Sequence, residues 1–484
     1  MPPNNNPIVK EVMKRSLLTG VLIGALCLGP SPAGAASSLQ ATALSLPSGT
    51  SGVFEGYFPG LSCTSAVNCV AVGTVNQTAS GQQGVIVTER AGTWLQGQAI
   101  VSPSGTQNTQ ALNVSCATAL SCTVAGTYVT AGQNQSAFVD SENNGVWGTA
   151  QTIALPADAA LSSENATPHG TSCAGVGTCA VVGTYTTPTG AIEGFTDTEV
   201  SGRWGSAVAL TLPADHALNP QVTFSQVSCW TAGSCSAVGS YVTTNGVISA
   251  FVVPSAKGHW GEAAPLVLPY NASAYSGATL SEITCYAPAT CTAIGTFNTV
   301  TGQNVPMVAT MTNGVWGRAT VVALPHNASA SAATFLWGYA GISCSALGTC
   351  AFGGNYVTAA GQHEGFLATE QSGKWRSATE LTLPAGAVDA GPNGGVIAVS
   401  CVKGNTCTAG AAYRNAGQNY EALLVTETSG AWNTPQPVTP PTGATTVGVD
   451  GGIYGLSCFV GAPCVVTGSY LAPTGHYQAF ALQK

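Results

Sequence analysis

The sequence predicts an all-β fold, an eight-bladed β-propeller of four-stranded antiparallel blades, and three observations support it. Sixteen of the 17 cysteines in the 484-residue chain form eight pairs, with five residues between the partners of each pair. The first cysteines of successive pairs lie 53 to 59 residues apart, which is the regular period of one structural unit used eight times. The last unit stops early, and the segment that it lacks is found near the amino terminus.

Composition narrows the class of protein. Only 7% of the residues are charged, against roughly 25% in soluble domains, while 45% are hydrophobic and 60 are glycine. This mixture excludes a disordered polyelectrolyte, a coiled coil and a protein that binds nucleic acid through a basic surface. The net charge of −8 predicts that phosphate backbones and anionic membranes are weakly repelled.

The first element is a predicted signal peptide at residues 1–35. Lys10, Lys14 and Arg15 precede an apolar run of 12 residues, 17–28, and the small residues at positions 33–35 form a cleavage site. A run of this length is too short to cross a bilayer core, which needs about 20 residues. We therefore expect a single mature domain, 36–484, without a membrane span, that is secreted or extracellular and that can associate with the cell surface.

The cysteine pairs predict one disulfide in each unit. Two cysteines that flank a five-residue turn lie opposite each other on an antiparallel hairpin, close enough to bond. The alternative is a metal site in each unit, but the chain has only six histidines and no pair of cysteines two residues apart, so we expect no metal. The predicted bridges are Cys63/Cys69, Cys116/Cys122, Cys173/Cys179, Cys229/Cys235, Cys285/Cys291, Cys344/Cys350, Cys401/Cys407 and Cys458/Cys464.

The rest of each unit predicts three further strands separated by turns. Small and aliphatic residues follow the second cysteine, then come a glycine-containing turn, an apolar stretch, a Gly-x-Trp turn and a short run that ends in Leu-Pro. We expect the tryptophans of the Gly-x-Trp turns to fill the gaps between blades. They are Trp94, Trp147, Trp204, Trp260, Trp316, Trp375 and Trp432.

The two ends of the chain predict how the units close into a ring. The last unit ends after its third strand, without a Gly-x-Trp turn or a fourth strand. Residues 41–47 match the fourth strands at 207–213, 319–325 and 378–384. We therefore expect the amino-terminal strand 41–47 to complete the last blade, which leaves no open sheet edge.

The Gly-x-Trp turns resemble part of a known repeat. Ser201-Gly-Arg-Trp204, Ser372-Gly-Lys-Trp375 and Ser429-Gly-Ala-Trp432 are similar to the Asp-box (BNR) turns of sialidase-like propellers, although the Asp is absent and the Trp is one residue closer to the Gly. The whole repeat more closely resembles secreted bacterial propeller proteins with cysteine-paired hairpins. The resemblance implies a propeller fold and little chemistry, because one fold can carry many functions.

A ligand site is expected on the face formed by the loops from second to third and from fourth to first strands. Glu364 and Glu421 occupy equivalent places on adjacent blades and are the best carboxylate pair, and His363 lies beside them. His216, Trp337 and Tyr275 are the candidate loop residues. Ordinary solvated loop positions are the alternative interpretation for each of these six residues.

Two repeated positions have structural and functional interpretations. The serine before the first cysteine forms a ring of hydroxyls that can hold water or a weak ion, or can satisfy backbone groups near the disulfide. A glutamate five residues before the tryptophan recurs in five units, which we interpret as the exposed side of an alternating strand rather than as a catalytic group. These glutamates are Glu89, Glu142, Glu199, Glu370 and Glu427.

The sequence favours a non-catalytic binding or scaffolding propeller for an extracellular glycan or protein, acting as a monomer without a cofactor. The alternative is a carbohydrate-active enzyme, sialidase-like or another glycoside hydrolase or lyase, that uses Glu282, Glu364 or Asp389 at the channel mouth. A sialidase needs three arginines that converge on a carboxylate, but four of the five arginines after residue 35 lie at or beside the Gly-x-Trp turns, on the opposite face. We therefore expect no catalytic residue.

Overall fold

The fold is taken from a computed structural model. It describes residues 39–54, 58–78, 81–103, 108–160, 165–330, 334–335, 341–403, 406–444 and 452–484. Residues 38–484 form one compact unit. The predicted signal peptide and Trp337 lie outside the described residues.

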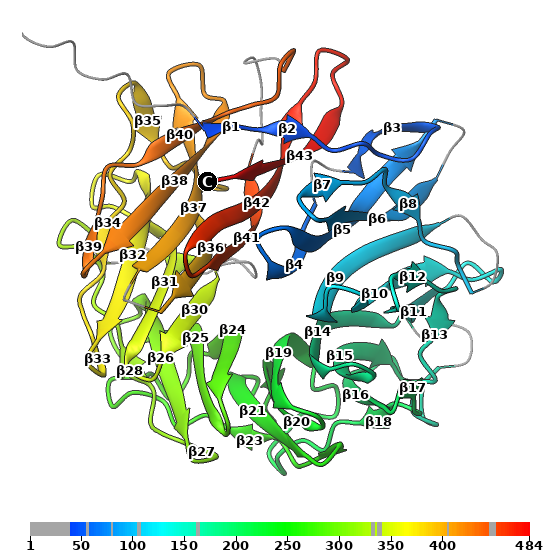
Figure 1. The fold of residues 1–484 in the computed structure, drawn as a ribbon. Coiled ribbons are helices and arrows are strands. Elements are labelled where there is room, and N and C mark those ends of the chain that lie inside the picture. Colours follow the sequence, from blue (N-terminus) through cyan, green and yellow to red (C-terminus); the bar gives the residue numbers. More distant parts are fainter. Residues whose placement is uncertain are drawn as a thin grey trace, which may run out of the picture. The chain divides into compact units, whose positions relative to one another are not determined.

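Three antiparallel strands recur in each repeat, and they lie side by side in order from the centre of the ring outward (Figure 1). The first strands are β4 (Gly60–Ser65), β9 (Thr109–Thr118), β14 (Thr167–Gly175), β19 (Thr223–Thr231), β24 (Ala278–Ala287), β30 (Ile342–Ala346), β36 (Gly395–Val402) and β41 (Ile453–Phe459). The second strands are β5 (Asn68–Gln77), β10 (Ser121–Val129), β15 (Thr178–Thr186), β20 (Ser234–Val242), β25 (Thr290–Asn298), β31 (Thr349–Val357), β37 (Thr406–Asn415) and β42 (Ala462–Leu471). The third strands are β6 (Gln82–Arg90), β11 (Gln135–Asn143), β16 (Ile192–Val200), β21 (Ile248–Ala256), β26 (Asn304–Thr312), β32 (His363–Gln371), β38 (Tyr420–Thr428) and β43 (Tyr477–Gln483).

Seven repeats continue with two short strands that both pair with the third strand. The tryptophan strands are β7 (Thr93–Trp94), β12 (Val146–Trp147), β17 (Arg203–Trp204), β22 (His259–Trp260), β27 (Val315–Trp316), β33 (Lys374–Trp375) and β39 (Ala431–Trp432). The fourth strands are β8 (Gln98–Ala99), β13 (Gln151–Thr152), β18 (Val208–Ala209), β23 (Ala264–Pro265), β28 (Thr320–Val321), β34 (Thr379–Glu380) and β40 (Gln436–Thr439). Three further strands pair with the ends of second strands: β3 (Thr50–Val53), β29 (Thr334–Phe335) and β35 (Ala387–Asp389).

The structure corrects the predicted fold class. Seven sheets, not eight, are complete blades with their own tryptophan and fourth strands, and the remaining sheet is a composite of β41, β42, β43 and β2 (Thr42–Ala43). The complete blades contain five to seven strands rather than four. The blades hold more than four strands because most third strands are nine residues long. The tryptophan strand pairs with one end of the third strand, and the fourth strand pairs with its middle.

The amino-terminal segment contacts three sheets rather than the single sheet predicted. β1 (Leu39–Gln40) pairs in parallel with β40, β2 pairs antiparallel with β43, and β3 pairs with β5. Figure 1 shows β1 and β2 beside the orange and red strands of the carboxyl-terminal end. The parallel pair also departs from the predicted all-antiparallel blades.

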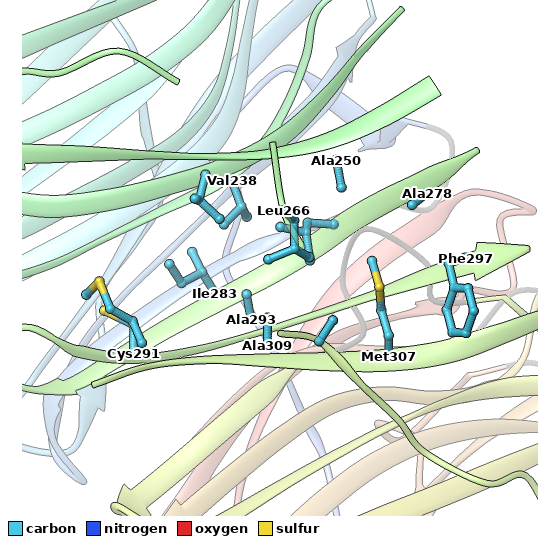
Figure 2. Packing of buried hydrophobic residues seen from close by; sticks show 14 residues of the cluster. Val238, Ala250, Leu266, Ala278, Ile283, Cys291, Ala293, Phe297, Met307 and Ala309 are labelled. Carbon is cyan, nitrogen blue, oxygen red and sulfur yellow. The ribbon is translucent and has the colours of Figure 1, made fainter. Parts of the chain in front are cut away.

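Apolar clusters join each sheet to the next. The side chains that fill the gap between the β20 and β25 sheets include Val238, Leu266, Ile283 and Phe297, which Figure 2 shows packed between neighbouring strands. Another cluster joins Leu44 of the amino-terminal segment to the last and first sheets. The seven Gly-x-Trp tryptophans all pack against such clusters, as the sequence predicted.

Disulfides join the first two strands of every repeat. All eight predicted cysteine pairs are bonded, which confirms the prediction of bridges over metal sites. The bonded pairs are Cys63–Cys69, Cys116–Cys122, Cys173–Cys179, Cys229–Cys235, Cys285–Cys291, Cys344–Cys350, Cys401–Cys407 and Cys458–Cys464.

The second cysteines belong to the packed interior rather than to an accessible site. Three of their sulfur atoms contact a threonine of the preceding blade: the Sγ of Cys179 lies 3.3 Å from Thr123 Oγ1, that of Cys350 lies 3.9 Å from Thr292 Oγ1 and that of Cys464 lies 3.6 Å from Thr408 Oγ1. Cys464, in the composite sheet, is half-buried. The other seven are at most 5% exposed: Cys69, Cys122, Cys179, Cys235, Cys291, Cys350 and Cys407.

The last hairpin departs from the predicted geometry of the bridge. In the seven complete blades the two cysteines pair in register, directly opposite each other. In the composite sheet the register shifts between Ser457 and Phe459, so Cys458 and Cys464 bond without being register partners. Pro463 precedes the second cysteine of this repeat only, and it has no N–H to donate to the ladder.

The serine before the first cysteine connects neighbouring blades. It accepts a hydrogen bond from the backbone N–H of the first cysteine in the next blade, as from Cys285 to Ser228 at 2.9 Å. This contact recurs at six junctions between sheets. Of the two interpretations of the serine ring, the structure therefore supports the one in which the hydroxyls satisfy backbone groups.

Candidate functional site

The central channel is the main candidate binding site. The first strands follow one another in a closed cycle, from β4 through β41 and back to β4. They enclose a cavity of about 600 Å³, lined by residues of all eight first strands or of the segments leading into them. A volume of this size is typical of small-molecule pockets, which span roughly 300 to 1,000 Å³.

A β-bulge shapes the channel wall. In six first strands the residue four positions before the first cysteine has no partner on the second strand, so the strand locally holds one extra residue. Bulges re-aim side chains and are frequent next to sites. The bulged residues are Leu112, His169, Ser225, Ser281, Ile397 and Tyr454.

The residue that follows the bulge position varies around the channel. Three complete blades and the composite sheet carry glycine there, including Gly170 of β14, and the others carry Asn113, Gln226, Glu282 and Ala398. The glycines allow adjacent first strands to approach closely, since a Cβ on Gly341 would lie 2.8 Å from the backbone nitrogen of Val399. The polar exceptions belong to β9, β19 and β24, with His169 of β14 between them, and they form what we call the polar wall.

The titratable groups of the polar wall are neutral at pH 7. Burial raises the pKa of Glu282 to about 8, although a hydrogen bond from the backbone N–H of Ile283 acts in the opposite direction. Burial lowers the pKa of His169 to about 4, and its Nε2 lies 3.1 Å from Thr184 Oγ1. Gln226 folds back in the same way as Glu282, because its Oε1 accepts a hydrogen bond from Val227 N at 2.9 Å. The lining therefore offers uncharged hydrogen-bonding groups.

The structure does not support the predicted Glu364 and Glu421 pair. The carboxylates that act on Glu364 are Glu380 and Asp389, which add to burial in raising its pKa to about 7. Glu421 is held instead by Tyr413, whose hydroxyl donates to Oε2 at 2.6 Å, and by the Nδ2 of Asn415. Equivalent positions on adjacent blades thus have separate partners.

A carboxylate cluster nevertheless surrounds Glu364. Its side chain is buried, and its Oε2 makes no hydrogen bond within the described residues. Asp389 is neutralised by the guanidinium of Arg414, which donates to both carboxylate oxygens at 2.7 and 2.6 Å. Tyr356 donates to Glu380 at 2.9 Å. The environment of Glu364 favours its protonated acid near pH 7.

The other predicted binding residues do not gather around one site. His363 precedes Glu364 in β32, and its Nδ1 lies 3.2 Å from Asn355 Oδ1. His216 is an exposed loop residue, and its Nδ1 lies 2.9 Å from the carbonyl oxygen of Ala217. Tyr275 is 90% exposed in a different loop.

The glutamates that precede the tryptophans are buried, so their interpretation as exposed positions was wrong. All five are at most 8% exposed, and burial raises the pKa of each. Glu89 and Glu427 pair in register with Cys69 and Cys407, so the glutamate lies opposite the second cysteine of its blade. The glutamate side chain therefore lies in the packed layer between two blades. The alternation of polar and apolar residues along one strand does not predict this burial.

The partly buried Glu282 and the buried Glu364 predict that acidification stabilises the fold. The pKa values of Glu282 and Glu364 are about 8 and 7 in the folded chain, above the ordinary 4.5, so the folded state gains stability as pH falls from 8.5 through these values. His169 opposes this gain only below its ordinary pKa of 6.5. We expect an unfolding free energy about 3 kcal/mol larger at pH 6.5 than at pH 8.5.

Chemical denaturation at the two pH values measures this difference. The double variant Glu282→Gln and Glu364→Gln is the control, because it removes both titrating groups and should flatten the dependence. Equal stability of the unaltered protein at both pH values, or greater stability at pH 8.5, would contradict the assignment.

Neither a metal centre nor an arginine cluster is found in the described part of the chain. No group of three or more His, Cys, Asp or Glu side chains there is arranged to hold a metal ion. The arginines are dispersed: Arg90 pairs with Glu142, Arg414 pairs with Asp389, and Arg318 lies 4.2 Å from the ring centre of Tyr270. No helix capable of spanning a bilayer occurs among the same residues.

Sequence reasoning missed most of the polar wall. Glu282 was a candidate only for the enzymatic alternative, and His169, which lies in β14, was not among the predicted binding residues. Asn113 and Gln226 were not considered. The available signal was the position three residues before each first cysteine, where a polar residue replaces the glycine of other repeats.

The comparisons with known proteins show similar propellers of low identity. No protein-family model matches the chain, and no curated protein matches it. The structure titled "YCF48 bound to D1 peptide" is 14% identical, covering 85% of this chain and 99% of that one with a TM-score of 0.38. The Hadza microbial sialidase Hz136 is 9% identical, covering 84% and 73% with a TM-score of 0.39. The α-L-arabinanase of Penicillium chrysogenum, complexed with arabinobiose, is 12% identical, covering 63% and 90% with a TM-score of 0.34. Because all three TM-scores are below 0.5, none of these likenesses supports a function for this chain.

Proposed function

We propose that this protein is exported and acts as a non-catalytic binding or scaffolding module, whose channel receives an uncharged polar ligand such as a glycan or a segment of another protein. The observation that carries this proposal is the neutral polar wall in a cavity of about 600 Å³. Amides and a protonated carboxyl can donate and accept hydrogen bonds without drawing in charged ligands.

Action outside the cytoplasm is supported by the disulfides. One bridge in each of eight repeats is typical of oxidising compartments and rare in the cytosol. The predicted signal peptide supports the same location from the sequence. We propose a monomer, in which each sheet buries its faces on its two neighbours.

The small number of carboxyl side chains in the channel lining supports a non-catalytic function. Glu282 is the single acid among the described residues that line the cavity. Glycoside hydrolysis ordinarily needs two carboxyl groups, about 5 to 9.5 Å apart, on the two sides of the scissile bond. A lone carboxyl in an otherwise neutral lining suits hydrogen bonding better than acid–base chemistry.

A pH titration of binding tests this function. Glycan and peptide arrays at pH 7 would identify a probe, and calorimetry would then compare its affinity at pH 7 and pH 9. We expect the affinity to fall about tenfold at pH 9, because ionised Glu282 no longer donates a hydrogen bond. Glu282→Gln keeps a neutral donor and should bind equally at both pH values. The exposed Glu262 provides the control substitution Glu262→Gln, which should behave as the unaltered protein.

The second candidate, a carbohydrate-active enzyme, is favoured by Glu364 alone. A buried carboxyl with a pKa of about 7 and an oxygen without a hydrogen bond has the properties of a general acid. Turnover of any glycan that disappears in Glu364→Gln would establish this candidate and contradict the non-catalytic proposal. The same arrays serve as substrates for the measurement.

A further inference from the structure

The turns at one end of the blades form a second surface that the channel does not use. The turn between the first and second strands of a blade is hydrogen-bonded to the turn that precedes its tryptophan strand, as from Gly92 N to Val67 O at 2.9 Å and from Gly145 N to Leu120 O at 3.0 Å. The same bond recurs in the next two blades, from Gly202 to Gly177 and from Gly258 to Gly233. We call the surface made by these paired turns the turn face.

The turn face exposes large aliphatic side chains. They are between 42% and 73% exposed, and they lie in the two kinds of turn or directly beside them, in five complete blades and the composite sheet. Large hydrophobic side chains such as Leu218, Ile248 and Val300 are also exposed at the opposite end, so the turn face is distinguished by the cations that accompany its aliphatic residues. The exposed aliphatic residues of the turn face are Val67, Leu120, Val146, Val176, Val200, Val315, Leu347 and Val460.

The turn face also exposes cations. Lys257 lies within a turn, Arg203 and Lys374 directly follow turns, and Lys403 lies in the hairpin that follows Cys401. All four side chains are exposed, as is Arg376 beside Trp375. Glu262, two residues after Trp260, is the exposed acid nearest in sequence to these turns. The exposed charge at this end is therefore mainly positive.

Apart from the exposed Glu262, the acids at the turn end lie beneath the surface that carries these cations. They lie five or seven residues before the tryptophans, and all are buried. Glu142 pairs with Arg90, while Asp140 and Asp197 accept backbone hydrogen bonds from Gly148 and Gly205. Asp158 and Asp215 instead lie in loops at the opposite end of the blades. They accept hydrogen bonds there from the hydroxyls of Tyr185 and Tyr241, which lie near the ends of second strands. The repulsion of anionic membranes expected from the net charge therefore applies to the chain as a whole and not to the turn face, whose exposed charge is mainly positive.

We propose that the turn face docks on the surface of an anionic lipid membrane. Exposed lysines and arginines are attracted to anionic headgroups, and aliphatic turn tips can enter the boundary between headgroups and acyl chains. An acidic polysaccharide or protein would use the cations without needing the aliphatic side chains. The combination of both groups on one face therefore favours lipid. Docking in this way leaves the opposite loops directed away from the membrane.

Vesicle sedimentation of the full oxidised protein tests the proposal. The probes are vesicles of phosphatidylcholine alone and vesicles that contain about 30% phosphatidylglycerol, in about 50 mM salt. We expect at least tenfold stronger binding to the anionic vesicles, weakened by about 500 mM salt because the headgroup attraction is screened. Co-sedimentation that does not depend on lipid charge, or no co-sedimentation at all, would overturn the proposal.

Two variants separate the contributions of charge and apolar contact. The charge variant Arg203→Gln, Lys257→Gln, Lys374→Gln and Lys403→Gln should lose at least tenfold in affinity. The apolar variant Val176→Ser, Leu347→Ser and Val460→Ser should lose at least threefold, while the control Leu218→Ser and Val300→Ser, exposed in loops at the other end, should bind normally. An apolar variant that binds as well as the unaltered protein, with soluble polyglutamate displacing the vesicles, would indicate an acidic polymer instead and reject the membrane. Circular dichroism verifies that each variant is folded.

Discussion

Reduction of the eight disulfides is expected to unfold the protein or to lower its melting temperature by more than about 20 °C. Each bridge closes a hairpin loop with a sequence separation of six residues. Such a loop contributes about 2 kcal/mol in the chain-entropy model, and eight together contribute roughly 15 to 20 kcal/mol as an upper bound. This sum exceeds the net stability of about 5 to 15 kcal/mol typical of a domain. The low proportion of charged residues leaves few ion pairs to compensate.

Thermal melting with and without a reductant, followed by circular dichroism, measures the effect. Seven of the eight second cysteines are buried, so complete reduction requires brief unfolding in denaturant before refolding. A single-bridge variant, Cys116→Ser with Cys122→Ser, is the matched control and should lose only about 2 kcal/mol. A fully reduced protein that melts within a few degrees of the oxidised one would show that burial between the sheets alone maintains the fold.

Replacement of Leu44 by aspartate is expected to open the junction between the last and first sheets. Leu44 is 6% exposed and packs with Val85, Val87 and Ala479. A carboxylate at this position would be buried without a partner, which costs at least about 3 to 5 kcal/mol in the free energy of unfolding. The neighbouring Ser45 is exposed, so Ser45→Asp adds the same charge in the same segment and should change stability little.

Urea denaturation of the two variants tests whether the amino-terminal segment joins the last and first sheets or only lies on the surface. If the amino-terminal segment merely lies on the surface, Leu44→Asp and Ser45→Asp will have equal midpoints. An open chain of sheets would also expose the edge of β43, so we expect Leu44→Asp to aggregate at concentrations where the control stays dispersed. Size-exclusion chromatography records that difference.

Much of the fold could be predicted because the same pattern of cysteine, glycine and tryptophan residues recurs in successive repeats. The cysteine spacing identified the hairpins, and the match of residues 41–47 to fourth strands directed attention to the amino-terminal segment. The number of strands in a blade was not predictable in this way, because the two short strands after each Gly-x-Trp turn are only two residues long in most blades. Nor does any local pattern show that Leu39 and Gln40 pair in parallel with β40.

The site was harder to predict, since it is made of departures from the repeat. Glu364 and Glu421 were paired because they occupy equivalent positions in adjacent repeats. An equivalent position defines where a residue lies within its own blade, but it does not define which side chains contact that residue. Asn113, Gln226 and Glu282 break the glycine pattern of the first strands, and three such departures on β9, β19 and β24 form one wall only once the ring is closed. A sequence comparison of repeats that asks where each one differs would have found them.

Hydrogen–deuterium exchange of the amino-terminal segment tests closure of the ring most directly. The amide of Ala41 bonds to Thr439 O of one sheet, and the amide of Leu44 bonds to Ala479 O of the next, each at 2.9 Å. We predict that both amides exchange as slowly as those of β43, because the three elements open together. Exchange of these two amides within seconds, at the rate of an unstructured peptide, while β43 stays protected, would contradict the closed arrangement on which the channel depends.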